Sequence, residues 1–205
     1  AQPRSRGLGD VYKRQYLTRC QTLLQSGLHV ADVLSFGGEG TPFAYSDANI
    51  PGYYADSCNA DVILNRLSAK DGKLVLPDGM SYRLLVLSKE TTMTPPLLRK
   101  IKKLVADGAT IIGKRPAKSP SLTNYPQCDN EVGQLAAELW DSGKIKDIPV
   151  EKALNDLSIQ PDFQSKSFTA IHRTTEDAEI YFVVNSSEAY SEQECTFRVD
   201  GRSPE

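Results

Sequence analysis

The clearest pattern of apolar and polar residues in the chain is a strand-helix-strand unit near its middle. Residues 84–87 are an unbroken apolar run, which is typical of a strand buried on both faces. Thr94 then precedes two prolines as a helix N-cap, and apolar residues recur at helical spacing over residues 95–107. A second apolar run follows at residues 109–113. Because a helix joins the two strands, we predict that they are parallel and that the crossover is right-handed.

Other segments extend this pattern on both sides. Helical spacing and capping residues predict four more helices: residues 16–26, a helix capped by Asp56 or Ser57, residues 130–140 capped by Asp129, and residues 150–157. Strand patterns occur at residues 30–36 and in a predicted hairpin of residues 73–76 and 81–86. Helices that alternate with strands indicate the α/β class, with a doubly wound, mainly parallel sheet in which residues 84–87 are central.

The pattern changes after Pro161, where strand-like segments follow one another without helices. They cover residues 168–173, 179–185 and 194–199. We therefore divide the chain into an α/β domain of residues 16–165 and a β-rich segment of residues 166–205. That segment is interpreted either as the start of a truncated β-sandwich or as an edge of the α/β domain.

The first residues are treated separately, because residues 5–15 (SRGLGDVYKRQ) resemble a translated sequencing adapter. We expect residues 1–15 to be a non-native leader and the natural protein to extend beyond both ends of the chain; the alternative is a flexible basic terminus. The leader holds four basic side chains against Asp10, a net charge of +3, so the formal charge of −2 becomes −5 without it. The rest of the chain is then acidic overall and has no excess of basic residues to attract nucleic acid, so we exclude that class of partner.

Composition and cysteine usage bear on whether the chain spans a membrane, binds a metal or contains disulfides. Hydrophobic residues make up 40% and charged residues 24% of the chain, and no apolar run reaches the length of a membrane span. The cysteines form no C-x-x-C pair and only two histidines are present, so we predict no metal site. The thiols are interpreted as isolated packed residues, with one disulfide left open because spacing does not determine pairing: Cys20, Cys58, Cys128 and Cys195.

Motifs for phosphate binding and nucleophilic catalysis are incomplete. Residues 37–40 (GGEG) follow the first predicted sheet strand but lack the spacing of a dinucleotide-binding loop and the Lys-Ser/Thr of a P-loop. Cys58 lies near a predicted helix start, where a thiolate would be favoured, but the sequence places no histidine to activate it. A packed thiol is the simpler interpretation, and His172, on a strand beside Arg173, is interpreted as structural.

Four acidic residues remain as candidates for binding a substrate: Glu39, Asp47, Asp56 and Asp61. They lie near the carboxyl end of the first predicted sheet strand, the edge where open α/β sheets place their ligands. Sugar chemistry uses such carboxylates in pairs. The alternative is that they are only solvated, in or near the polar loop of residues 37–52. Loops of that length without secondary structure of their own are usually functional or disordered.

Several segments together resemble the family 106 glycoside hydrolases, which are α-L-rhamnosidases. The most distinctive are residues 65–83 (NRLSAKDGKLVLPDGMSYR) and residues 113–126 (GKRPAKSPSLTNYP). The resemblance runs almost continuously from Tyr16 to Glu205, in the same order and with the same spacing. It implies a large bacterial enzyme, periplasmic or extracellular, that removes terminal L-rhamnose from plant polysaccharides.

The resemblance also implies where the chemistry resides. The catalytic glutamates and calcium site of the family belong to a (β/α)8 barrel, and this chain resembles the region after it: an amidotransferase-like, flavodoxin-like α/β domain and the first strands of a β-sandwich. We therefore expect no catalytic residue, metal or other cofactor in this chain, and contact with a carbohydrate substrate only through the parent enzyme. The domain would pack on the barrel, with the loop of residues 37–52 facing it and Glu39 orienting substrate. The alternative is a standalone non-catalytic module for binding or oligomerisation.

Overall fold

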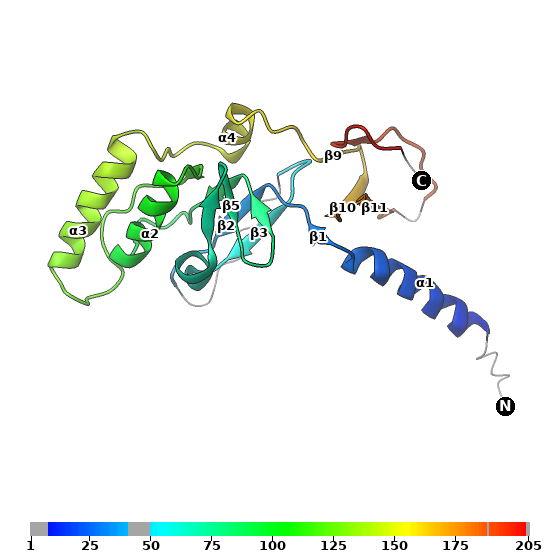
Figure 1. Ribbon diagram of the computed structural model, residues 1–205, viewed down its shortest axis with the longest axis horizontal. Coiled ribbons are helices and arrows are strands. Elements are labelled where there is room, and N and C mark those ends of the chain that lie inside the picture. Colours follow the sequence, from blue (N-terminus) through cyan, green and yellow to red (C-terminus); the bar gives the residue numbers. More distant parts are fainter. Residues whose placement is uncertain (1–7, 41–49, 188, 204–205) are drawn as a thin grey trace. The chain divides into compact units, whose positions relative to one another are not determined.

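The computed structural model describes residues 8–40, 50–187 and 189–203 and divides the chain into two compact units (Figure 1). The central unit comprises residues 31–164, and the terminal unit comprises residues 1–30 together with residues 165–205. The terminal unit combines both ends of the sequence because a strand of residues 28–29 pairs with one near the C-terminus. The change of unit at residues 164–165 lies where the sequence pattern changes, and residues 16–30 group with the β-rich segment.

A parallel sheet of four strands forms the core of the central unit. Its strands, in spatial order, are β3 (Ala55–Cys58), β2 (Val33–Phe36), β7 (Leu84–Val86) and β8 (Ile111–Ile112). All neighbouring pairs are parallel, with Val33 opposite Leu84 and Leu85 opposite Ile111. This confirms that residues 84–87 supply a central strand, parallel to the strands before and after it. The predicted strand of residues 30–36 is shorter than expected, since β2 begins at Val33.

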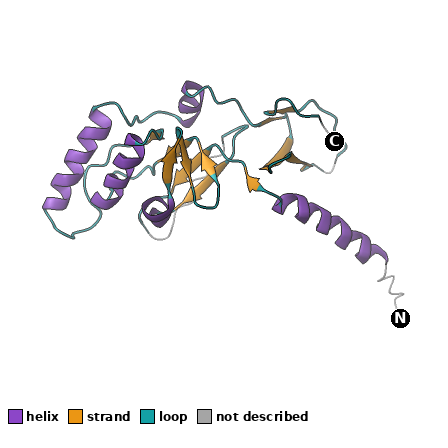
Figure 2. Cartoon of the chain, viewed as in Figure 1, coloured by secondary structure: helices purple, strands orange, loops and turns teal. Residues whose placement is uncertain are grey.

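Helical segments flank this sheet in the sequence and in space (Figure 2). They are η1 (Val62–Arg66, a single π-helical turn), α2 (Pro95–Ala106), α3 (Gln127–Ala136), its π-helical continuation η2 (Ala137–Asp141), and α4 (Val150–Asp156). Thr94 is the N-cap of α2 as predicted, and Gly108 beyond its end has a φ of 96°, a left-handed conformation that suits glycine. The predicted apolar stripe of α2 is buried: Leu97, Leu98, Ile101 and Leu104.

The side chains of the parallel sheet point alternately to two faces, and both faces are covered. Leu34, Phe36 and Leu85 pack with buried residues of α2 and α3 in the larger hydrophobic cluster. Val33 and Leu84 face the opposite way and pack with buried residues of α4. Because both faces exclude water, consecutive positions are apolar, which explains the continuous runs in the sequence. The α/β class is confirmed, while the amidotransferase-like type stays a prediction.

A small antiparallel sheet precedes β7. It consists of β4 (Ser68–Lys70), β5 (Lys73–Val75) and β6 (Ser81–Tyr82), in that order. The predicted hairpin is confirmed by β5 and β6, whereas β4 has no counterpart in the sequence prediction. The turn between β4 and β5 places Asp71 and Gly72 at φ values of 52° and 74°, typical of a two-residue hairpin turn. The Asp-Gly pair was therefore the available signal for β4.

The predicted helix cap at Asp56 or Ser57 is wrong, because both residues lie in strand β3. The helical turn η1 begins only at Val62, whose N–H donates to Asn59 Oδ1 at 3.1 Å. β3 is an edge strand and its sequence is largely polar, so it lacks the apolar run that identified its neighbours.

The predicted helix start at Asp129 is also wrong. Helix α3 begins at Gln127, and Asp129 lies in its first turn. The Asp129 carboxylate accepts the backbone N–H of Ser119 at 2.9 Å and makes no side-chain bond that caps the helix. An acidic residue in the first turn is favourable to the helix dipole, so its position in the sequence was compatible with either role.

The terminal unit contains one long helix, α1 (Leu8–Gln25), which begins within the adapter-like leader and not at residue 16 as predicted. Leucine, lysine, arginine and glutamine in residues 8–15 are good helix formers, so the helix continues through them. Most described side chains of α1 are exposed. The role of residues 1–15 as a non-native leader stays a prediction.

An antiparallel sheet forms the rest of the terminal unit. Its strands, in order, are β1 (Leu28–His29), β10 (Phe168–Thr174) and β11 (Glu179–Asn185), which confirms two of the three predicted strands. The third predicted strand, residues 194–199, is present only as the shorter β12 (Thr196–Phe197). A further short strand, β9 (Phe163–Gln164), lies at the end of the central unit. A β-sandwich beyond this sheet stays a prediction.

The double burial of the parallel sheet predicts the effect of removing one side chain. Leu85 in β7 is 0% exposed, so Leu85→Ala leaves a cavity in a packed core. We expect the free energy of unfolding, measured by urea denaturation, to fall by about 2–5 kcal/mol. Leu122→Ala is the matched control, because the Leu122 side chain is 82% exposed. Its effect should stay within about 0.5 kcal/mol, and equal effects of the two substitutions would contradict the central placement of β7.

Candidate functional site

The carboxyl edge of the parallel sheet is the candidate site, because ligands of open α/β sheets bind where the parallel strands end. Three segments leave the sheet at this edge. Residues 37–40 follow β2, residues 87–94 connect β7 to α2, and residues 113–126 connect β8 to α3. The start of α2 and the start of α3 therefore lie at this edge.

Glu39 fixes the loop after β2 to the start of α2. Its two carboxylate oxygens accept the Thr94 N–H at 2.7 Å and the Thr94 hydroxyl at 2.6 Å. The carboxylate also lies at the positive end of the α2 dipole, where negative charge is stabilising. Gly38 beside it has a φ of 97°, which allows the chain to turn back toward Thr94.

A cavity of about 380 Å³ lies beside the first turns of α2. Pro95 and Pro96 of α2 and Leu64 of η1 supply apolar walls. The loop of residues 119–124 and the first turns of α3 supply polar walls. All of these segments belong to the central unit, so the cavity is formed within one compact body.

Side-chain hydroxyls hold the loop over this cavity in shape. The Ser121 N–H donates to Ser119 Oγ at 3.1 Å, and the Thr123 N–H donates to Ser121 Oγ at 3.1 Å. Ser121 Oγ in turn donates to Thr123 Oγ1 at 2.9 Å, and Asp129 anchors the start of the loop through the Ser119 N–H. Such side-chain-to-backbone bonds take the place of a regular ladder, so the loop is ordered without being a strand or a helix.

A bidentate ion pair forms another part of the wall. Arg99 Nε and Nη2 donate to the two carboxylate oxygens of Glu131 at 2.6 Å and 2.9 Å, joining α2 to α3. Hydrogen bonds from Arg99 hold the pKa of Glu131 below its ordinary value, and the same bonds raise the pKa of Arg99. Both groups therefore stay charged, and the pair contributes no net charge to the cavity.

The structure does not bring the four predicted acidic residues together. Glu39 lies at the carboxyl edge against Thr94, whereas Asp61 accepts the Asn65 side-chain amide at 2.7 Å on the exposed surface of η1. Asp56 in β3 accepts the Tyr82 hydroxyl at 3.0 Å, and burial together with this carboxylate raises the pKa of Tyr82. Asp47 lies outside the described residues. A role for these residues in substrate binding stays a prediction.

The polar residues that do gather around the cavity come from another part of the chain. Ser119, Ser121, Thr123 and Asn124 belong to the segment of residues 113–126. In the sequence, that segment is distinctive only of the family resemblance. Serine, threonine and asparagine in a proline-rich loop are usual in surface connections, so nothing in their pattern separated a binding wall from an ordinary loop.

Cys58 is a packed thiol, as the simpler interpretation held. It ends strand β3, is buried, and belongs to the larger hydrophobic cluster. Burial raises the pKa of Cys58 from 9.0 to about 12, so the thiol is protonated at neutral pH. The environment of Cys58 therefore disfavours an activated thiolate, since a nucleophilic cysteine needs a lowered pKa.

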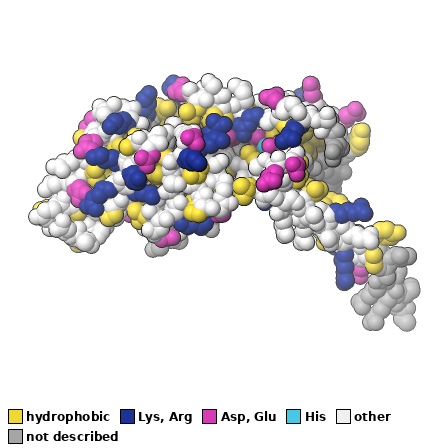
Figure 3. All heavy atoms as spheres, in the orientation of Figure 1, with side chains coloured by type: hydrophobic (Ala, Val, Ile, Leu, Met, Phe, Trp, Pro, Cys, Tyr) yellow, Lys and Arg dark blue, Asp and Glu magenta, His cyan; other side chains and the backbone are white. Residues whose placement is uncertain are grey.

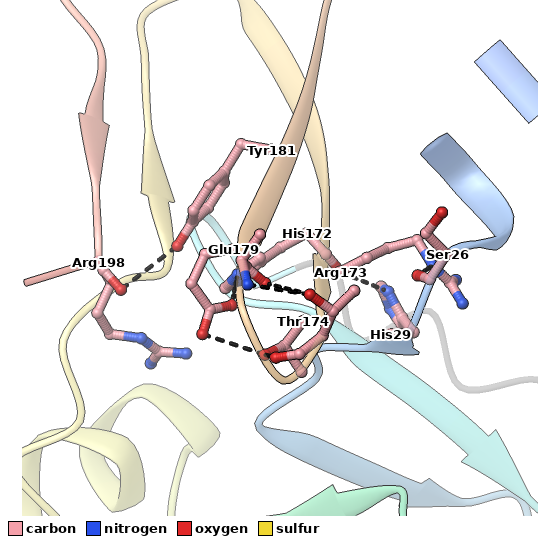
Figure 4. Close-up of polar contacts among 10 residues, drawn as sticks. Ser26, His29, His172, Arg173, Thr174, Glu179, Tyr181 and Arg198 are labelled. Carbon is pink, nitrogen blue, oxygen red and sulfur yellow. Dashed lines mark hydrogen bonds and ion pairs between the residues drawn. The ribbon is translucent and has the colours of Figure 1, made fainter. Parts of the chain in front are cut away.

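His172 is the centre of a polar cluster in the terminal unit (Figure 4). Its Nε2 lies 2.8 Å from Glu179 Oε2, and its ring stacks on Tyr181 with centroids 3.9 Å apart. Glu179 also accepts the Thr174 hydroxyl at 3.1 Å, and the Tyr181 hydroxyl donates to the Arg198 carbonyl at 3.4 Å. His172 is buried, and these contacts tie β10 to β11. The structural interpretation of His172 therefore fits its surroundings.

Arg173 in the same cluster holds the end of α1. Its Nε donates to the Ser26 carbonyl at 2.6 Å and its Nη2 to the Gly27 carbonyl at 2.7 Å. Carbonyls at a helix C-terminus lack partners within the helix and carry partial negative charge, so a guanidinium there is stabilising. This contact anchors the C-terminal end of α1 to β10, although much of the helix surface is exposed.

Metal-ligand clusters and membrane-spanning helices are both missing from the described residues. No group of three or more His, Cys, Asp or Glu side chains among them could hold a metal ion. None of their helices is long and apolar enough to cross a bilayer. On the face shown in Figure 3, basic and acidic side chains are interspersed and form no extended region of one sign.

The contact between Glu39 and Thr94 predicts a measurable stabilisation. Glu39→Ala leaves the Thr94 N–H at the start of α2 without this acceptor, so we expect a loss of about 1–2 kcal/mol in the free energy of unfolding. Glu39→Gln keeps one acceptor oxygen and should lose less. Urea denaturation measures both, with the exposed Glu192→Ala as control. A loss no larger than that of the control would show that Glu39 does not anchor α2.

The raised pKa of Cys58 predicts its reactivity. At pH 8 a maleimide should modify the half-buried Cys195 and leave Cys58 unmodified until the chain is unfolded in urea, as read by mass spectrometry of peptides. The unfolded thiol loses its proton near pH 9 and the folded one only near pH 12, so Cys58 should also reduce stability as pH rises through that interval. Rapid labelling of Cys58 in the folded chain would contradict this placement.

Comparison with known proteins identifies the family. Residues 12–205 match the family model Glyco_hydro_106, described as alpha-L-rhamnosidase. A rhamnosidase structure from Novosphingobium sp. PP1Y is similar with a TM-score of 0.80 and 34% sequence identity, over 90% of this chain and 20% of that one. A Formosa agariphila protein named "Putative beta-glucuronidase" is 38% identical over 198 residues, 93% of this chain and 17% of that protein. The chain thus spans about a fifth of the length of these relatives. Because the family model covers nearly the whole sequence, this chain belongs to glycoside hydrolase family 106, the α-L-rhamnosidase family.

Proposed function

We propose that this chain is a non-catalytic α/β part of an α-L-rhamnosidase that acts on rhamnose-containing plant polysaccharides. The observation that carries the proposal is the family match over residues 12–205. The likeness to a rhamnosidase structure supports it. This chain covers only 20% of that protein, which leaves room for a separate catalytic domain in the parent enzyme. The glycosidase activity then belongs to a longer parent enzyme.

The chemistry of the described residues supports a non-catalytic role. Glycoside hydrolysis uses two carboxyl groups across the scissile bond, about 5–9.5 Å apart depending on the stereochemical outcome. Glu131 is the one carboxylate among the described residues that line the cavity, and Arg99 holds it in a bidentate ion pair. Both oxygens of Glu39 are engaged by Thr94. We therefore assign the catalytic glutamates and the calcium site of the family to a barrel outside this chain.

The role left to this chain is to support that barrel. The carboxyl edge, with the loop of residues 37–52, is the surface we assign to the barrel and its carbohydrate substrate. Glu39 holds residues 37–40, the described start of this loop, against α2. A role for Asp47, Asp56 and Asp61 in contacting the substrate remains part of this proposal. We place the parent enzyme in the periplasm or outside the cell, where such polysaccharides are met.

A β-glucuronide is a second candidate substrate for the parent enzyme. One specific observation favours it: the 38% identical relative carries the name "Putative beta-glucuronidase". Both substrates place a single sugar at the end of a chain, and they differ in that the glucuronide bears a carboxylate. The barrel would decide between them, because a carboxylate needs a basic partner at the site where the terminal sugar binds.

Activity measurements test this function. We expect the isolated chain to release no aryl alcohol from an aryl α-L-rhamnoside, because no pair of carboxylates at the required separation has been found in its candidate site. The parent enzyme, expressed from the longer gene, should hydrolyse the same compound and leave an aryl β-D-glucuronide intact. The reverse preference would favour the second candidate. Turnover by the isolated chain that persists through repurification would contradict the non-catalytic assignment.

A further inference from the structure

We propose that the cavity beside the first turns of α2 is a binding site for an uncharged saccharide unit. Its volume of about 380 Å³ is in the range of small-molecule sites, about 300–1,000 Å³. All of its lining residues belong to the central unit, so the cavity lies within one compact body. The proposed function enters only in the choice of sugar, and the site itself rests on the geometry of the cavity.

The apolar walls of the cavity suit the carbon face of a sugar ring. Leu64, Pro95 and Pro96 present C–H surfaces, and the rings of the two prolines are rigid. A pyranose ring has faces of C–H groups, and a 6-deoxy sugar such as rhamnose adds a methyl group in place of a hydroxymethyl group. Burying these groups against the prolines removes apolar surface from water, which is favourable.

The polar wall offers hydroxyl groups with hydrogen-bonding capacity to spare. A serine or threonine hydroxyl can donate once and accept twice. In the contacts found among the described residues, Ser119 Oγ and Thr123 Oγ1 accept hydrogen bonds, while neither of their own O–H groups donates to a protein acceptor. Both can therefore donate to the oxygens of a sugar. The bonds within the loop fix these groups in advance, which reduces the ordering cost of binding.

The charge of the cavity favours an uncharged ligand. Arg99, the cationic side chain in the cavity wall, already donates hydrogen bonds from Nε and Nη2 to the two carboxylate oxygens of Glu131. The start of α2 offers few free donors to an anion, because Pro95 and Pro96 have no N–H and Glu39 accepts the Thr94 N–H. A sugar acid would have to compete with Glu131 for Arg99. A neutral sugar meets no such competition and can accept or donate bonds at the outer side of the pair.

Titration of the isotope-labelled full chain with methyl α-L-rhamnoside, followed by NMR, tests the proposal. We expect the amide signals of Ser121 and Thr123 to shift with a Kd of about 1 mM, a weak affinity that is usual for a single small ligand. Thr123→Val keeps the shape of the side chain and removes its hydroxyl, so it should raise Kd about fivefold. Thr169→Val in β10 removes the same group from an exposed position elsewhere and should leave Kd unchanged.

A second substitution tests whether the charge of the cavity favours an uncharged ligand. Glu131→Gln removes the carboxylate and frees Arg99 in part, so methyl β-D-glucuronide should gain affinity at least fivefold. Absence of any shift at about 10 mM rhamnoside, tenfold above the expected Kd, would overturn the proposal. Tighter binding of the glucuronide than of the rhamnoside to the parent sequence, or equal binding by Thr123→Val, would overturn it as well.

These results are independent of the test of function. A parent enzyme that cleaves rhamnosides, together with a cavity that binds no sugar, would end the cavity proposal alone. A cavity that binds the rhamnoside, together with a parent enzyme that does not cleave it, would end the proposed activity and leave the binding site in place.

Discussion

Burial of β2 and β7 on both faces is the constraint on which the central unit depends. These strands carry apolar residues at consecutive positions, so each needs a covering layer above and below. Helices α2 and α3 supply one layer and α4 the other. The helix α2 also serves as the crossover from β7 to β8, and such a crossover allows these neighbouring strands to run parallel. The same arrangement brings the ends of the strands and the starts of α2 and α3 to one edge.

The sequence was informative wherever burial left a pattern. Residues 84–87 and the stripe of α2 were recognised because both faces of one and one face of the other are apolar. Strand β3 escaped recognition because an edge strand keeps polar residues, and Ala55–Cys58 then resembled the approach to a helix cap. Helix α1 was predicted too short, since helix propensity alone carries it through residues that no core requires.

The candidate site was harder to predict than the fold. The place of Glu39 after the first strand of the parallel sheet predicts its position at the carboxyl edge, where it does lie. The sequence does not show that Thr94 engages both of its carboxylate oxygens. Asp56 and Asp61 are near Glu39 in sequence and engaged elsewhere in space. The cavity draws on η1, α2, a loop and α3, so its members are distant in sequence. Their convergence depends on helix packing, which leaves no local signature.

The contact between Glu39 and Thr94 also makes two parts of the protein thermodynamically dependent on each other. Glu39 belongs to the loop after β2, and Thr94 lines the cavity beside α2. A rearrangement of the loop that withdraws the carboxylate alters the cavity wall, and a ligand that holds Thr94 in place opposes that withdrawal. Linkage is reciprocal, so whatever free energy the loop gains from an occupied cavity, the cavity gains from a settled loop. The Glu39 carboxylate thus couples the conformation of the loop after β2 to the occupancy of the cavity beside α2.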